Sequence, residues 1–377
     1  MTKLKKLDQK DIDIIGALSR LGPKMSTEEV GDLVDIPPRT VRYRIKKMRE
    51  AGVLNPTRVM ALERRMGLGE SVFIIESMEK GYDLLPEVFY LVDTIYHYSP
   101  TYGRYNGFLA YSLYSLSTPR IVRRILEECQ KNDLLSDFFI IDVTDYDAKG
   151  ADYSKFDPEC GWTWDAGQWE QKIEKNVKSK KKFRNPMSAA QTIVEYDYKD
   201  VSILRLMFDN GEITQKELAK TLQLSEAQVN KRIHRLEKKG IIKGYSSALA
   251  GSSDLLMLFC FLELKDPKGP VLPSIYDLPF PATVIMESEA RYAITTQFSS
   301  KSLSGFLRGL DLLKPYLNST FIQTIHGSKS SMDSHPYDLY DKDTHGWVTP
   351  GDEYLKDVRD VLAGKRAVKE QSKKKSG

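Results

Sequence analysis

Apolar residues recur at helical spacing in two stretches that lie far apart in the chain. Each stretch begins at an aspartate, Asp8 or Asp197, which suits the N-cap of a helix. The apolar positions that follow are three residues apart, as one face of a helix requires: Ile12, Ile15 and Leu18, then Val201, Leu204 and Met207. The pattern predicts an amphipathic helix at each place.

Two more helices are predicted behind each of these. The second begins at Ser26 or Thr214, and each is followed three residues later by a glutamate, Glu29 or Glu217, in a capping box. A short turn leads into a third helix, which ends at Gly52 or Gly240. Three helices with a tight turn between the second and third predict a helix-turn-helix.

The two helical stretches are copies of each other. Residues 26–54 align without gaps with residues 214–242, at a constant offset of 188. A weaker match follows, in which a Tyr-x-x-aromatic-Asp segment precedes a Gly-Trp pair, at Gly161-Trp162 and again at Gly346-Trp347. A duplication is the simplest explanation. We interpret each Gly-Trp pair as a packed turn with an aromatic anchor, and we favour this over a ligand site.

The third helices carry a polar face whose chemistry suits DNA. One face of each is apolar: Val41, Ile45 and Met48, then Val229, Ile233 and Leu236. The opposite face of the first carries Arg39, Arg42, Tyr43, Lys46 and Lys47, with Thr40 on its flank. The opposite face of the second carries Gln228, Asn230, Lys231, His234 and Arg235. Arginine reads guanine edges, Gln and Asn read adenine, and lysine neutralises phosphate. These residues are the predicted DNA contacts, against the alternatives of a solvated charged face or a protein-interaction module.

Short β-prone segments follow both third helices. Residues 53–59 and 241–245 are predicted to form the wings of two winged helices. Arg58 and Lys243 are predicted to contact phosphate from these wings.

The middle of each copy alternates strands and helices. Strands are predicted at Ser71–Ser77, Ile95–Ser99, Phe108–Ser115 and Phe138–Thr144, with helices at Leu84–Asp93 and Pro119–Leu134. The second copy repeats the order, with a poorly marked first helix between Pro267 and Pro281. The order βαββαβ predicts a ferredoxin-like module. The fold class is therefore α+β, with two repeats, each a winged helix-turn-helix followed by a ferredoxin-like module.

These motifs resemble the Lrp/AsnC family of bacterial and archaeal regulators, most closely in the second copy. That copy carries Thr214-Gln-Lys-Glu-Leu-Ala219 and Gly240-Ile-Ile-Lys-Gly244-Tyr245, whereas the first departs from the pattern at Pro37-Pro38. The resemblance implies double-stranded DNA as partner and a regulatory (RAM/ACT-like) module that pairs subunits and binds amino acids or other small effectors. The segment Tyr102-Gly-Arg-Tyr-Asn106 resembles the family's glycine-containing loop. Gly103, Tyr105 and Asn106 are the effector contacts that this implies, and a dimerisation sheet without a ligand is the alternative.

Six segments follow from these patterns. Winged helices are expected over residues 1–66 and 191–250, ferredoxin-like modules over 67–146 and 251–327, and Gly-Trp segments with a basic linker and tail over 147–190 and 328–377. Our hypothesis is one chain that mimics a dimer, with the two ferredoxin-like modules face to face and the winged helices roughly 34 Å apart. Further oligomerisation through the same modules is left open. The basic runs at 172–184 and 365–375 are either solvated or add non-specific phosphate contacts.

Composition adds modest constraints. The net charge is only +4, so local clustering carries the DNA argument rather than overall charge. Three cysteines without CxxC spacing fit a reducing cytoplasm, and the chain has neither an apolar run of about 20 residues nor a signal-peptide pattern. No cofactor is expected.

Enzymatic motifs are not apparent. The sequence has no P-loop, HExxH or GxSxG, and its five histidines lack metal-ligand spacing, so neither catalytic nor metal-binding residues are predicted. One enzymatic alternative has a similar architecture, because siroheme decarboxylases resemble this family and act on a tetrapyrrole. The dense basic face on the third helix of the first copy favours DNA binding over a tetrapyrrole enzyme.

Overall fold

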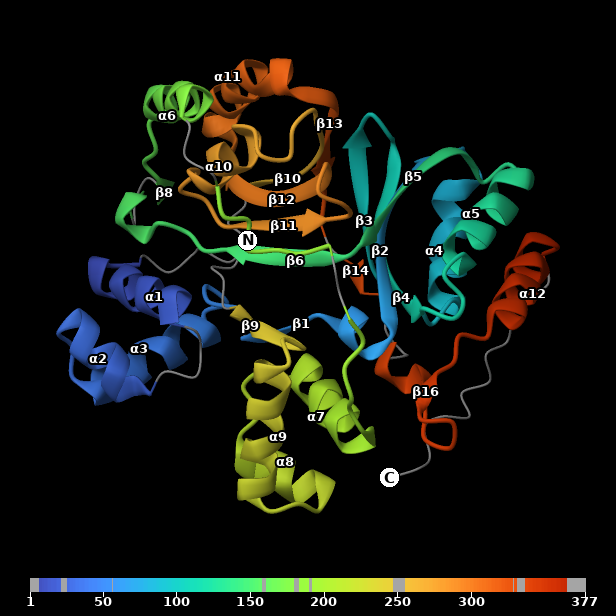
Figure 1. The fold of residues 1–377 in the computed structure, drawn as a ribbon, viewed down its shortest axis with the longest axis horizontal. Helices are drawn as coiled ribbons and strands as arrows, with labels where there is room; N and C mark the ends of the chain where they lie inside the picture. Colours follow the sequence, from blue (N-terminus) through green and yellow to red (C-terminus); the bar gives the residue numbers. More distant parts are fainter. Residues whose placement is uncertain are drawn as a thin grey trace. The chain divides into compact units, whose positions relative to one another are not determined.

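The computed structural model describes residues 7–21, 26–55, 57–157, 161–179, 183–189, 192–246, 255–327, 329–330 and 336–364. The chain divides into two compact units (Figure 1). The first comprises Met1–Leu62 with Asp145–Ile322, and the second comprises Glu63–Thr144 with Gln323–Gly377. The predicted basic positions at 180–182 and 365–375 lie outside the described residues.

The first unit contains both three-helix modules that the sequence predicts. The first module comprises α1 (Gln9–Leu21), α2 (Thr27–Val34) and α3 (Pro38–Glu50). The second comprises α7 (Tyr198–Asp209), α8 (Gln215–Leu222) and α9 (Glu226–Lys238). Both predicted capping boxes of the second helices are present. Gly52 and Gly240 have φ of 65° and 66°, the left-handed conformation that ends a helix and favours glycine.

Each third helix leads into a single strand, and the two strands pair with each other. Strand β1 (Arg58–Ala61) runs antiparallel to β9 (Ile242–Ser246), with Arg58 opposite Ser246. The expected pair of separate wings is therefore corrected to one ribbon that both modules share. The physical reason is that each module supplies only one strand, and a strand must find a partner for its backbone groups.

The first unit also holds the second ferredoxin-like module. Its βαββαβ elements are β10 (Leu255–Leu264), α10 (Val271–Tyr276), β11 (Ala282–Met286), β12 (Arg291–Ser299), α11 (Leu303–Leu313) and β13 (Leu317–Ile325), whose last three residues are counted with the second unit. The sheet order is β13-β10-β12-β11, and the poorly marked helix is the short α10. Strand β6 (Asp145–Lys149) extends this sheet by pairing with β11, although it follows the first ferredoxin-like module in the sequence.

The second unit is built on the first ferredoxin-like module. Its elements are β2 (Leu68–Ser77), α4 (Gly81–Leu91), β3 (Ile95–Gly103), β4 (Gly107–Ser115), α5 (Ile121–Lys131) and β5 (Leu135–Val143). The sheet order β5-β2-β4-β3 is that of the predicted fold. Two short pieces of the later chain pair with β3, namely Gln323–Ile325 at the end of β13 and β14 (Lys329–Ser330).

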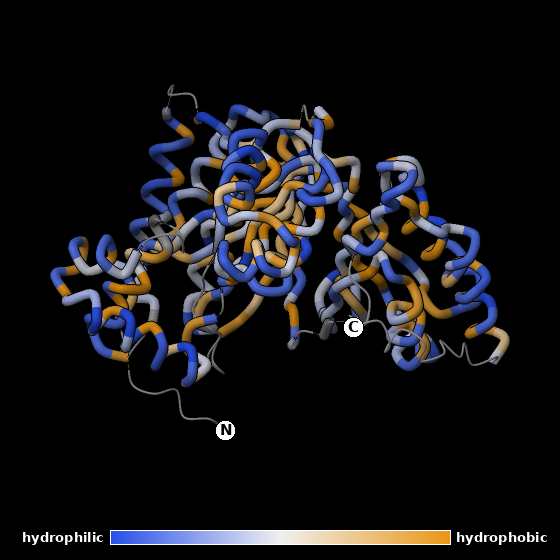
Figure 2. The backbone as a smooth tube through the Cα atoms, turned by 90° about the horizontal axis from the view of Figure 1, so that it is seen from below, coloured by the Kyte–Doolittle hydropathy of each residue, from blue (hydrophilic) through white to orange (hydrophobic). Residues whose placement is uncertain are grey.

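The Gly-Trp segments are exchanged between the copies. Helix α6 (Ala166–Lys178) follows the first ferredoxin-like module but packs on α10 and α11 of the second. Helix α12 (Gly351–Leu362) follows the second module but packs on α4 and α5 of the first. Both helices alternate hydrophobic and hydrophilic residues, as do most helices in Figure 2, because each buries one face.

Both Gly-Trp pairs form the aromatic turns that the sequence predicts. Strands β7 (Phe156–Asp157) and β8 (Gly161–Trp162) make one small hairpin, and β15 (Tyr340–Asp341) and β16 (Gly346–Trp347) make the other. Both tryptophans are buried. Five single-turn 3-10 helices complete the described elements: η1 (Glu63–Met66), η2 (Tyr153–Lys155), η3 (Ser300–Ser302), η4 (Lys314–Tyr316) and η5 (Pro336–Leu339).

Candidate nucleic-acid interface

Helices α3 and α9 are each held by the apolar face that the sequence predicts. Val41, Ile45 and Met48 of α3 are buried, and so are Val229, Ile233 and Leu236 of α9. The opposite faces are therefore left to solvent. This confirms the predicted orientation of both helices within their own modules.

The outward face of α3 is basic. Arg39, Arg42, Tyr43 and Lys46 are exposed, and Thr40 and Lys47 are half-buried. Contacts on this face are solvent-exposed. Arg42 donates to the Thr27 hydroxyl at 3.1 Å and lies 3.8 Å from Glu28, and Lys46 lies 3.7 Å from Glu50. The Lys47 ammonium lies 5.6 Å from the centre of the Tyr43 ring. Solvent-exposed contacts of this kind stabilise by no more than about 1 kcal/mol, so a phosphate readily replaces them.

The outward face of α9 is less charged, and more of its groups are engaged. Gln228 closes the N-terminal capping box, because its side-chain oxygen accepts from the Ser225 backbone N–H at 2.8 Å. The oxygen of Asn230 accepts from Gln215 at 3.2 Å, and the His234 ring nitrogen Nδ1 lies 3.2 Å from Glu237. Lys231 is exposed and forms no hydrogen bond or ion pair with its side chain among the described residues.

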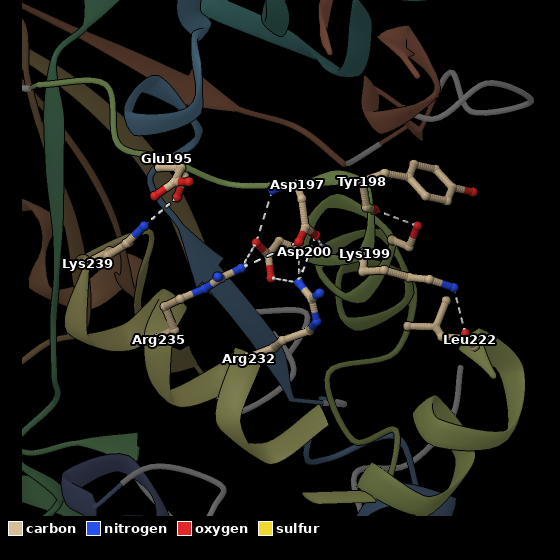
Figure 3. A network of polar contacts seen from close by, with 10 residues as sticks. Glu195, Asp197, Tyr198, Lys199, Asp200, Leu222, Arg232, Arg235 and Lys239 are labelled. Atoms are coloured by element: carbon tan, nitrogen blue, oxygen red, sulfur yellow. Dashed lines mark hydrogen bonds and ion pairs between the residues drawn. The ribbon is translucent and has the colours of Figure 1, made fainter. Parts of the chain in front are cut away.

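Arg232 and Arg235 of α9 bind the two aspartates that begin α7 (Figure 3). Arg232 lies 2.7 Å from Asp197 and 2.9 Å from Asp200, and Arg235 also pairs with Asp200. Asp200 is fully buried. Burial raises the pKa of Asp197, but the hydrogen bonds from Arg232 and from the Asp200 backbone outweigh it and hold the pKa below its ordinary value. Arg235 therefore binds Asp200 of α7, while its side chain stays partly exposed on the outward face of α9.

The first module contains the same arrangement. Arg44 of α3 lies 2.9 Å from Asp8 and 2.8 Å from Asp11, the two carboxylates of the capping box of α1. The sequence pattern predicts Asp8 and Asp197 as caps but does not predict these ion pairs. The available signal was an Asp-x-x-Asp pair in both copies together with an arginine at the repeat offset, Arg44 and Arg232.

The two phosphate contacts predicted on the shared ribbon differ in exposure. Arg58 on β1 is exposed. Lys243 on β9 instead donates to the Asp145 carboxylate and to the Tyr146 carbonyl, and its side chain is 19% exposed. Its ammonium is drawn inward because Asp145 would otherwise be a buried carboxylate without a cation. Lys243 thus fastens β9 to the start of β6.

A second link joins the two helical modules of the first unit. Glu212, in the turn after α7, pairs with Arg49 of α3 and accepts from the Thr57 backbone N–H at 3.0 Å. Leu62 also donates its N–H to the Ile241 carbonyl at 2.7 Å. With the β1–β9 ribbon, these bonds connect the first module directly to the second.

The predicted effector loop lies in the second unit, between β3 and β4. Gly103 and Asn106 are exposed, whereas Tyr105 is buried. The side chain of Gln323 closes the loop, because it accepts from the Tyr105 N–H at 3.1 Å and donates to the Tyr105 carbonyl at 2.6 Å. The backbone of Tyr105 is therefore engaged. So is that of Asn106, whose N–H donates to Glu76 and whose carbonyl accepts from the Ser77 N–H at 2.9 Å and the Tyr82 hydroxyl at 3.0 Å. The side chain of Asn106 is exposed, and its amide oxygen lies 3.5 Å from the Gly103 N–H.

Within the described ranges, histidine, cysteine, aspartate and glutamate nowhere gather in groups of three that could hold a metal ion. None of the described helices combines the length and apolarity that crossing a bilayer requires. Cys129 and Cys260 are buried free thiols, and burial raises the pKa of each to about 12.

Similar proteins were found by family, by sequence and by structure. A winged helix-turn-helix DNA-binding family model matches residues 7–55 and again 196–243. An uncharacterized HTH-type transcriptional regulator from Pyrococcus abyssi is 37% identical over 129 residues, which is 32% of this chain and 82% of that protein. The leucine-responsive regulatory protein of Rhizobium meliloti is 41% identical over 75 residues, 19% of this chain and 47% of that protein, so the chain spans about half of this relative.

A solved structure matches nearly the whole chain. The siroheme decarboxylase NirDL superposes on 94% of this chain and 100% of its own, with a TM-score of 0.53. A second structure of that enzyme, in co-complex with an iron-uroporphyrin III analogue, gives a TM-score of 0.54. The sequence identities are 9% and 10%, so the likeness concerns the fold alone.

Proposed function

The chain belongs to the Lrp/AsnC family of DNA-binding transcriptional regulators, and we propose that it works as an internal pseudo-dimer whose two halves read one asymmetric DNA site. The β1–β9 ribbon carries this proposal. Arg58 and Ser246 face each other in it and are 188 residues apart, the offset of the repeat. Antiparallel pairing of equivalent segments is the relation that a two-fold axis produces between subunits.

The exchanged Gly-Trp segments support the same proposal. Helix α6 packs on the second ferredoxin-like module and α12 packs on the first, so each module uses a helix from the other copy. Reciprocal exchange of one element is how identical subunits swap segments in a dimer. Joining two such subunits in one chain gives the pseudo-dimer.

The proposed DNA contacts divide unequally between the halves. Arg39, Arg42, Lys46 and Lys47 on α3, with Tyr43 and Thr40, supply phosphate affinity and guanine readout, and exposed Arg58 adds a backbone contact. On α9, Lys231 supplies phosphate affinity, and Asn230, His234, Gln228 and Arg235 supply milder contacts because internal bonds already engage them. Lys243 is left out of this set, since its ammonium binds Asp145. The two faces differ, so the proposed target is an asymmetric double site.

The test is an electrophoretic mobility shift assay of the purified full chain with genomic DNA fragments. The assay is repeated at several salt concentrations. We expect specific shifts whose affinity falls steeply with salt, by a slope of about −0.9 for each phosphate contacted. Absence of specific binding at every salt concentration would contradict the regulator. Insertion of about five base pairs between the half-sites should abolish two-headed binding, because half-sites read by paired modules are spaced by whole helical turns.

Response to a small effector is the second part of the proposal. The Gly103–Asn106 loop is one candidate contact, and the exposed side-chain amide of Asn106, held only by contacts of 3.5 Å to Gly103 and Glu76, is the group that an effector would take. An Asn106→Ala variant that loses an amino-acid effect on DNA affinity, while keeping DNA binding itself, would support this contact. An equal amino-acid effect on DNA affinity in the variant and the parent chain would show that the loop is not the effector contact.

One observation favours a second candidate function. The fold of siroheme decarboxylase NirDL spans almost the whole chain, whereas the sequence relatives cover a third of it or less. A siroheme-decarboxylase-like enzyme would bind a tetrapyrrole, so absorbance titration with iron-uroporphyrin III discriminates. A saturable spectral change without specific DNA binding would support the enzyme and contradict the proposed regulator. The basic face of α3 is what favours DNA, because a tetrapyrrole enzyme has no need of it.

A further inference from the structure

Strand β9 contains a β-bulge at Lys243. The register of the ribbon shifts between two consecutive residues of β1, because Met60 lies opposite Gly244 and Ala61 lies opposite Ile242. Lys243 is therefore the extra residue of the bulge, with no residue opposite it. A bulge changes the direction of the side chain that it carries. Here the side chain reaches the start of β6, where 19% of it is exposed.

Lys243 joins the ribbon to the ferredoxin-like sheet of the first unit. Its ammonium donates to the Asp145 carboxylate and to the Tyr146 carbonyl. Asp145 is buried, and its second carboxylate oxygen accepts from the Ser188 N–H at 2.9 Å. The same residue lies opposite Met286 in the pairing of β6 with β11. Removing one partner of a buried ion pair leaves an uncompensated charge, so this connection resists opening.

Tyr146 holds the other strand of the ribbon. Its hydroxyl donates to the Ala61 carbonyl on β1 at 3.0 Å, and the Lys243 ammonium lies 5.3 Å from the centre of its ring. Asp145, Tyr146 and Lys243 thus hold β1 and β9 to β6 at adjacent positions, and we call these three residues the clamp. Helix α9 ends at Lys238, a short distance along the chain from the clamp.

We propose that the clamp fixes the two reading helices, α3 and α9, at one separation and one relative orientation, and so restricts the chain to DNA sites of one half-site spacing. The clamp residues are positioning residues and do not touch DNA. One added base pair moves a half-site by about 3.4 Å and turns it by about 35° around the duplex, so a fixed pair of helices tolerates few spacings. The spacing step rests on the proposed function, whereas the rigid attachment of the ribbon does not.

The rigid attachment is tested without DNA, by electron paramagnetic resonance distance measurements on the full chain. Spin labels are placed at two exposed positions, Lys220→Cys on α8 and Lys301→Cys in η3. Cys129 and Cys260 are buried and are kept, and the remaining cysteine is replaced as Cys160→Ser. We expect the parent chain with these labels to give one narrow distribution of distances.

Two variants open the clamp at different points. Lys243→Met removes the cation and keeps the length of the side chain, whereas Tyr146→Phe removes only the hydrogen bond to Ala61. We expect both to broaden the distribution, Lys243→Met more strongly. The matched control is Lys238→Met, an exposed lysine outside the clamp, which should keep the parent distribution. Thermal unfolding shows that each variant is folded, and Tyr146→Phe alone decides if Lys243→Met is not.

The spacing step is tested on a DNA fragment that the parent chain binds specifically, with base pairs inserted one at a time between its half-sites. We expect the first insertions to weaken binding by the parent chain roughly tenfold or more, because both helices no longer engage at once. Lys243→Met should bind the inserted fragments nearly as well as the original one. It should also bind a fragment with the first half-site alone as tightly as the parent chain does. Lys238→Met should follow the parent profile.

The proposal is overturned if the folded clamp variants keep the narrow distribution of the parent chain. A broader distribution with an unchanged spacing profile would overturn the spacing step. So would a loss of DNA affinity that is equal at every spacing, since that result indicates a structural role alone. Broadened distributions in a chain that binds no DNA would support the clamp while contradicting the DNA-reading function.

Discussion

Arg44 on α3 donates to both carboxylate oxygens of Asp8 at 2.9 Å, which ties α3 to the N-cap of α1. Arg232 and Asp197 repeat the arrangement in the second module, at 2.7 Å. The orientation of each outward face therefore depends on an ion pair as well as on the buried apolar stripe. The two copies differ in burial, since Asp200 is fully buried and its counterpart Asp11 is partly exposed.

Replacing Arg232 should destabilise the chain more than replacing Arg44. Arg232→Ala leaves the buried Asp200 carboxylate with Arg235 alone, and breaking a buried pair costs about 3–5 kcal/mol. Arg44→Ala leaves partly solvated carboxylates, so we expect a loss of about 1–2 kcal/mol. Urea unfolding of the two variants measures the difference. Lys231→Ala, an exposed neighbour, serves as control, and equal losses in both arginine variants would contradict the burial argument.

Stability should fall as pH rises through the range set by Glu63. The Tyr337 hydroxyl donates to Glu63 at 2.8 Å, while burial and the nearby Glu70 raise the pKa of Glu63 from 4.5 to about 8. The folded chain holds a proton that the unfolded chain releases, so this group stabilises the fold below pH 4.5 and loses that effect as pH rises to about 8. Glu63→Gln, which cannot ionise, should flatten the pH profile of unfolding and gain stability at pH 8. An unchanged profile would show that Glu63 titrates normally.

Basic residues of α3 should contribute more to DNA affinity than the basic tail does. Arg42→Ala combined with Lys46→Ala removes two exposed cations from the outward face, and we expect the salt slope to fall by about two. Fluorescence anisotropy with a specific fragment at several salt concentrations measures both affinity and slope. Lys374→Ala, in the tail, is the control. If the double variant and the control lose affinity equally, α3 is not the reading helix.

The exchanged helices should make the two copies dependent on each other. Residues 1–190 and 191–377, produced separately, each lack the helix that covers their own ferredoxin-like module, α12 or α6. We expect neither piece to unfold cooperatively alone, and a mixture to assemble into a complex that does. Size-exclusion chromatography and circular dichroism check this. A cooperative transition in isolated residues 1–190 would show that α12 is dispensable.

Trp169 should account for much of the stability that α6 provides. Its ring stacks on Phe306 of α11 at 5.8 Å between centroids, and its Nε1 donates to the Ser274 carbonyl at 2.8 Å. Trp169→Ala should cost about 3–5 kcal/mol, because it opens a cavity and leaves the carbonyl unpaired. Thermal unfolding measures the loss. Gln168→Ala, an exposed neighbour on the same helix, should stay near the parent value.

Sequence patterns alone predicted the local elements and most of the order in which they occur. Helical periodicity, capping boxes and terminal glycines encode α1–α3 and α7–α9, because those signals act within a few residues. The βαββαβ order was equally readable, except for the short α10 in its Pro-rich stretch. The constant offset of 188 shows the duplication in the sequence itself.

Tertiary structure alone decided which partners those elements take. The sequence placed β1 and β9 as separate wings, whereas the folded chain pairs them with each other. It assigned Lys243 to phosphate, whereas Lys243 binds Asp145. It left α6 and α12 unassigned, whereas the folded chain exchanges them between the copies. Each of these contacts joins residues about 100 or more positions apart. Local sequence shows only that a partner is needed, whether for a strand edge, a buried carboxylate or an apolar helix face. Which residue supplies it depends on packing across both copies, and no local pattern encodes that.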